Sequence, residues 1–191
     1  VSALIKEFKK RKWWLVQIAP QINDSEQTDE FLKNIGLKKI IAVPYSSGLI
    51  SLQPDKEQLI MSLKKKWRYS LRKSKGLGVN VNKLVGSKND YEILLRRYRA
   101  LQSENQFNGI SESLITSLSK RKAKGWEVNL FTANKGDSLN TENCYGMLVS
   151  VHHGETATYF IGITSDDGRE LQVNYLLLWQ AMLHAKSSGC K

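Results

Sequence analysis

The chain has 191 residues, of which 41% are hydrophobic and 25% charged, and its formal net charge is +11. This composition is typical of a globular protein and excludes a wholly disordered chain, while two cysteines are too few for a disulfide framework. No apolar run approaches the roughly 18 residues of a membrane span, and the first residues lack the apolar core of a signal peptide. We therefore expect a cytoplasmic protein without a transmembrane segment. Its excess of cations favours a polyanionic partner, such as nucleic acid, a phosphorylated cofactor or an anionic membrane surface.

The first part of the chain predicts alternating helices and extended segments. Residues 3–12 carry apolar side chains at helical spacing, and Ser25 is a suitable cap for a second helix over 26–34. Extended structure is expected in three short apolar runs, at 13–20, 37–43 and 49–52.

The next part predicts a long helix, a strand and two further helices. Asp55 would cap a helix that continues through the basic region and breaks at 76–78. A strand over 79–85 follows, and then helices over 91–105 and 111–125.

From residue 126 the hydrophobic period changes to about two. The pattern predicts three antiparallel strands, at 126–133, 144–151 and 156–163. A polar loop over 164–172 then leads to an apolar helix over 173–187. This order indicates an α+β fold with a mixed, largely antiparallel sheet flanked by helices. Because so apolar a helix normally leads to another buried element, we expect further strands of the fold after Gly189.

A basic cluster is the strongest local signal. Seven cations and no acid occur within twelve residues: Lys64, Lys65, Lys66, Arg68, Arg72, Lys73 and Lys75. At 100° per residue, several of these cations share one helix face, whereas Trp67 and Leu71 lie on another. Such a stripe suits a phosphate backbone or a pyrophosphate, and a solvated helix face is an equally good interpretation.

The positions of the histidines and cysteines in the sequence do not indicate a metal site or a covalent nucleophile. His152 and His153 are neighbours in a strand and point to opposite faces, so they cannot share a metal, and His184 stands apart. Cys144 is better interpreted as a buried residue than as half of a Cys–His dyad. We expect no metal and no resident cofactor.

The start of the last helix is a candidate anion site. Its first turn offers unpaired N–H groups and the positive end of the helix dipole, at Asn174 and Tyr175. In a purely structural interpretation, Asn174 is the helix cap.

Two segments together resemble the Fem-type (FemABX) aminoacyltransferases. Residues 65–79 resemble the basic helix of that family. Residues 159–189 resemble its second motif, with Tyr-x-x-Gly, then Tyr-x-Leu-x-Trp and Ala-Lys-x-x-Gly. The resemblance implies a partial tandem of two GNAT-like domains. Residues 1–58 would be the second half of the first domain, and 59–191 the second domain without its last strands.

The resemblance also implies a reaction. An amino acid would pass from aminoacyl-tRNA to an amine of a peptidoglycan precursor by direct attack. The residues implied in donor-phosphate contacts are Lys66, Arg68 and Arg72, and those implied in the acyl-transfer cleft are Tyr159, Gly162, Asn174 and Tyr175. No catalytic residue is identified: Glu155, His152 and His153 are general-base candidates by residue type alone, and the substrate could itself accept the proton.

Two alternatives remain open. Related GNAT-like proteins of exopolysaccharide and cell-surface glycan synthesis share both segments, which implies acyl-CoA as the other donor. The third alternative is a non-catalytic RNA-binding protein on a GNAT scaffold.

Overall fold

The computed structural model describes residues 2–11, 15, 18, 25–40, 47–121, 123–136 and 138–191. The chain divides into two compact units, residues 1–49 and 50–191.

The first unit contains two helices, α1 (Ser2–Lys10) and α2 (Glu26–Asn34). Ser25 caps α2 as predicted, because its side chain accepts a hydrogen bond of 3.2 Å from the Thr28 N–H. Residues 37–40 form neither helix nor strand, and the same is true of 49–52. Most of the predicted extended run at 13–20, and residues 41–43, lie outside the described residues.

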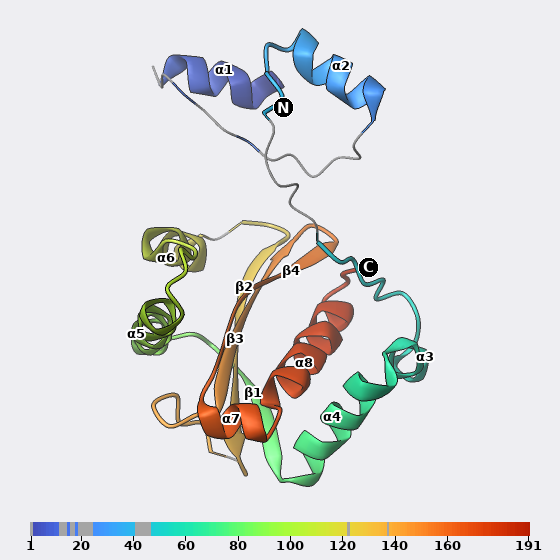
Figure 1. The fold of residues 1–191 in the computed structure, drawn as a ribbon, viewed down its shortest axis with the longest axis vertical. Helices are drawn as coiled ribbons and strands as arrows, with labels where there is room; N and C mark the ends of the chain where they lie inside the picture. The colour runs from blue at the N-terminus through green and yellow to red at the C-terminus, as the bar shows by residue number, and fades with distance from the viewer. Residues whose placement is uncertain are drawn as a thin grey trace. The chain divides into compact units, whose positions relative to one another are not determined.

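A four-stranded antiparallel sheet forms the centre of the second unit (Figure 1). Its strands follow chain order: β1 (Val79–Leu84), β2 (Trp126–Lys135), β3 (Gly146–His153) and β4 (Thr156–Thr164). All four predicted strands are present within about two residues of their expected ends. The register of β3 against β4 shifts between Val149 and Ser150, which marks a β-bulge.

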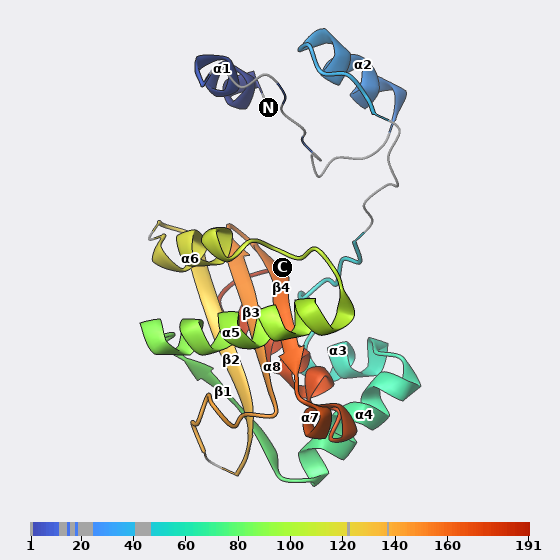
Figure 2. The ribbon, with the colours of Figure 1, turned by 60° about the vertical axis from the view of Figure 1, so that its left-hand side comes forward.

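Helices cover both faces of this sheet. Figures 1 and 2 show α8 (Val173–Ser187) and α4 (Lys65–Gly76) on one face, and α5 (Lys88–Asn105) and α6 (Glu112–Lys120) on the other. Successive side chains of β2 point to opposite faces of the sheet, so the sheet has a hydrophobic core on each face. Phe131 packs in the core under α8, and its neighbour Leu130 packs in the core under α5. Helix α6 ends at Lys120, five residues before the predicted end. None of the helices in the described residues is long and apolar enough to cross a membrane.

The single helix predicted from Asp55 to residue 75 is wrong, since the chain forms two helices there. Helix α3 (Lys56–Ser62) begins with a capping box at Asp55, and the backbone then becomes extended at Leu63, with ψ 144°. The Arg68 guanidinium of α4 donates hydrogen bonds to the carbonyls of Met61, at 2.8 Å, and Leu63. A side chain therefore satisfies carbonyls that a continuous helix would have bonded internally.

The predicted loop over 164–172 also contains a helix, α7 (Asp166–Glu170), which Ser165 caps. The prediction that Asn174 caps the last helix is wrong. Helix α8 begins at Val173, and the cap position belongs to Gln172, whose φ is 57°. Because the left-handed turn at Gln172 sets the start of the helix, Asn174 lies exposed within its first turn.

Candidate functional site

Helix α4 presents the basic cluster to solvent. We call its exposed cations the α4 cationic surface: Lys64, Lys65, Lys66, Arg72, Lys73 and Lys75. Leu71 is buried against α8 on the opposite face, and Trp67 packs edge-on against Tyr175 with 5.4 Å between ring centroids. Among the described residues, none of these cations forms an ion pair with a carboxylate. The surface therefore keeps its charge available for a polyanion.

Arg68 differs from the other two predicted phosphate contacts. It is half-buried, and its guanidinium bonds to the carbonyls at the end of α3. Lys66 and Arg72 are exposed on α4. The structure thus gives Arg68 a part in joining α3 to α4, and it leaves Lys66 and Arg72 facing solvent.

The predicted cleft residues fall into two groups. On β4, the Tyr159 hydroxyl lies only 2.1 Å from where a Cβ at position 162 would stand, so the absence of a side chain at Gly162 makes room for it. Burial raises the pKa of Tyr159, and the nearby Tyr98 raises it further. At the start of α8, Tyr175 contacts Trp67 of α4, while Asn174 is exposed.

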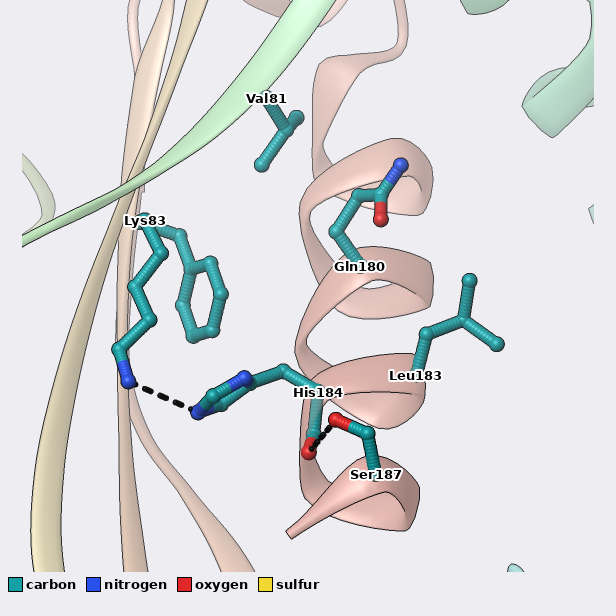
Figure 3. Close-up of a pocket in the computed structure, with 7 residues that line it drawn as sticks. Val81, Lys83, Gln180, Leu183, His184 and Ser187 are labelled. Carbon is teal, nitrogen blue, oxygen red and sulfur yellow. Dashed lines mark hydrogen bonds between the residues drawn. The ribbon is translucent and has the colours of Figure 1, made fainter.

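A groove runs along the seam between β1 and α8. It contains two pockets of about 310 Å³ each, which share Val81 and Gln180 in their walls. Lys75 of the α4 cationic surface lines one of them. The other is drawn in Figure 3, where Lys83 and His184 point toward each other across its wall. None of Tyr159, Gly162, Asn174 and Tyr175 lines either pocket.

A cluster of titratable side chains lies beside the pocket of Figure 3. Glu127 of β2 and His152 of β3 are register partners, and both face His184 of α8. Glu127 Oε2 lies 3.6 Å from His152 Nδ1 and 3.6 Å from His184 Nε2. We call these three residues the His–Glu cluster. Lys83 Nζ of β1 lies 2.7 Å from Glu127 Oε1 and 2.9 Å from His184 Nε2.

The surroundings of the His–Glu cluster shift two of its pKa values downward. Burial opposes ionisation of Glu127, but hydrogen bonds from Lys83 and Asn129 and the charge of Lys83 outweigh it, so the pKa lies below its ordinary value. Burial also lowers the pKa of His152, and this effect exceeds the opposite effect of the Glu127 charge. At neutral pH the cluster therefore combines a carboxylate with a neutral buried imidazole.

Sequence reasoning missed the His–Glu cluster. The prediction that His152 and His153 cannot share a metal is confirmed, because His153 Nε2 lies 2.8 Å from Thr158 Oγ1 and not in the cluster. The cluster itself has no local sequence signal, because His152 follows Glu127 by 25 positions and His184 follows His152 by 32. A predicted register of β2 against β3 would have placed Glu127 opposite His152, and this pairing is the one sign of the cluster that the sequence offers.

The remaining candidates for chemistry are engaged elsewhere. Cys144 is buried, and its Sγ accepts a hydrogen bond of 2.8 Å from Arg97 Nη1. Burial raises the pKa of this thiol, which makes it a poor nucleophile. Glu155 forms a 2.6 Å ion pair with Lys191.

Comparison with known proteins identifies the class. A family model described as an acetyltransferase (GNAT) domain matches residues 61–191, and the chain belongs to this family of acyltransferase domains. Within that class, the fold is that of a Fem-type protein, as the sequence motifs predicted. The chain is similar to the crystal structure of FemX, with a TM-score of 0.73 and 13% sequence identity.

The match to FemX has unequal coverage. It includes 98% of this chain and 65% of the FemX chain, so the protein described here spans less than two thirds of its length. At this identity the likeness shows a shared fold. No curated protein matches the chain. The domain boundary predicted between residues 58 and 59 stays a prediction.

Proposed function

We propose that the protein transfers an amino acid from aminoacyl-tRNA to an amine of a peptidoglycan precursor. The observation that carries this proposal is the α4 cationic surface, because it lies on a GNAT acyltransferase domain with the fold of FemX. A tRNA presents many phosphates in a row, and its binding rewards a row of unpaired cations more than a single pyrophosphate would.

The proposed chemistry is direct attack by the acceptor amine. The amine lone pair forms the new C–N bond, the ester C–O bond to the terminal ribose breaks, and a proton passes from the amine to the leaving hydroxyl, directly or through the substrates. The protein would contribute by holding the two substrates in reacting geometry and stabilising the developing charge. This scheme agrees with the state of Cys144, which is buried and hydrogen-bonded to Arg97.

The residues proposed for these tasks are those of the two motifs. Lys66 and Arg72 would contact the donor phosphates, and Arg68 would support them by fixing the start of α4. Tyr159 and Gly162 on β4 would line the cleft together with Asn174 and Tyr175 on α8. The contact between Tyr175 and Trp67 supports the α8 part of this arrangement, since it ties the start of α8 to the basic helix.

Salt-dependent binding tests the donor. The double variant Lys66→Gln with Arg72→Gln removes two exposed cations, and each lost phosphate contact lowers the slope of log K against log salt by about 0.7 to 0.9. We therefore expect the slope for aminoacyl-tRNA to fall by about 1.5. The matched control is Lys88→Gln with Lys120→Gln, which removes two exposed cations from the helices on the other sheet face. An unchanged slope in the α4 variant would refute the tRNA contact.

The second candidate function is acyl-CoA-dependent N-acylation in surface-glycan synthesis. The family description as an acetyltransferase domain favours it. Calorimetry with acetyl-CoA separates the two, because a CoA-dependent enzyme binds it and transfers its acyl group to an amine. Tight binding of tRNA without transfer to any amine would instead identify an RNA-binding protein.

A further inference from the structure

The His–Glu cluster brings three potential metal ligands together from three separate elements. Their ligand atoms all lie within 4.8 Å of one another. A tetrahedral zinc ion, with bonds of about 2.0 to 2.1 Å, holds its ligands about 3.4 Å apart. The two separations of 3.6 Å from the Glu127 carboxylate are close to that value. The two imidazole nitrogens lie within 4.8 Å of each other, so they would have to approach by up to about 1.4 Å to reach that separation.

The chemistry of the cluster favours a cation of the zinc class. Two imidazoles and one carboxylate form a ligand set that zinc uses where a fourth position stays open. The His152 side chain is only 5% exposed, and the ring nitrogen that it turns toward Glu127, 3.6 Å away, is Nδ1.

Lys83 contacts two of the three members of the cluster, and His184 Nε2 also lies 3.1 Å from Asn129 Oδ1. The Lys83 ammonium lies within hydrogen-bond distance of both Glu127 Oε1 and His184 Nε2. The cluster therefore already binds a cation, which the chain itself supplies. The Lys83 side chain is 36% exposed and lines the open pocket of Figure 3, so it can turn toward solvent when another cation enters. His184 of the cluster lines the same pocket.

We propose that Glu127, His152 and His184 bind a divalent cation of the zinc class, and that the Lys83 ammonium competes with it for the site. Lone pairs of the two imidazoles and the carboxylate would form the metal bonds, while Lys83 remains protonated and moves into the pocket. This site stands independently of the acyl-transfer proposal, because neither the donor nor the acceptor enters the argument.

Metal titration of the whole chain tests the proposal. Zn²⁺ affinity is measured by competition with a chromophoric chelator, and Co²⁺ serves as a probe whose visible spectrum reports tetrahedral coordination. We expect Glu127→Gln and His184→Gln each to weaken binding by about a hundredfold or more. Lys83→Met should strengthen binding by about tenfold, since the metal then displaces no charge-assisted hydrogen bonds.

Matched controls separate this site from adventitious binding. His153→Gln changes a histidine of the same strand that faces the other side of the sheet, and Lys88→Met removes an exposed lysine on α5. Both should bind Zn²⁺ as the wild-type chain does. Binding that survives in Glu127→Gln and His184→Gln would overturn the assignment, as would a lack of binding in both the wild type and Lys83→Met. Glu127 and His184 are partly exposed, so their variants test the site without emptying the core.

Discussion

Substitution of Arg68 by methionine separates a structural role from a donor-binding role. The guanidinium donates from one nitrogen, Nη1, to the carbonyls of Met61 and Leu63 at the end of α3. Methionine keeps much of the apolar stem and removes the donor. The change therefore removes the Arg68 hydrogen bonds to the carbonyls of Met61 and Leu63, while the packing around α4 is largely retained.

The expected cost follows from these contacts. A hydrogen bond from a charged group contributes about 1.5 to 3 kcal/mol, but both bonds share one nitrogen and water can reach the freed carbonyls of the half-buried site. We therefore expect Arg68→Met to lower the free energy of unfolding by about 1 to 2 kcal/mol. With a urea m-value of about 2 kcal/mol/M, the midpoint would fall by roughly 0.5 to 1 M.

Urea unfolding followed by tryptophan fluorescence measures this shift. Arg72→Met is the matched control, because Arg72 is exposed on the same helix and should change stability by less than about 0.5 kcal/mol. The reasoning is refuted if Arg68→Met unfolds at the wild-type midpoint and instead reduces the salt dependence of tRNA binding. That result would assign the guanidinium to phosphate and not to α3.

Two further predictions concern the packing around β3. In Gly168→Ala, the new Cβ would lie 2.1 Å from the Tyr145 carbonyl oxygen, so α7 must move, and we expect a loss of about 1 to 3 kcal/mol in urea unfolding. Gly76→Ala is its control, since a Cβ there meets nothing within 4 Å, and equal stability of the two variants would contradict the packing. The Cys144 thiol is buried and its pKa is raised, so it should react with Ellman's reagent far more slowly in the native protein than in urea. A fast reaction in the native protein would show that the contact with Arg97 does not protect the thiol.

The sheet and its helices could be predicted because their signals are local. A period of about two places β2, β3 and β4, and the apolar run after Gln172 places α8, since alternation reports burial directly. The break between α3 and α4 was hidden for the opposite reason. Apolar spacing continues through Leu63, and the Arg68 side chain, five residues later, bonds the carbonyls of Met61 and Leu63 at the end of the first helix.

The same distinction applies to the two candidate sites. The α4 cationic surface is visible in the sequence by itself, because its cations fall within twelve residues and no acid lies among them. The His–Glu cluster exists only in the tertiary structure. Strand register places Glu127 beside His152, and the packing of α8 on the sheet adds His184. Helix periodicity can thus group charges along one surface, whereas bringing together ligands that lie far apart in sequence requires strand pairing and the packing of a helix on the sheet.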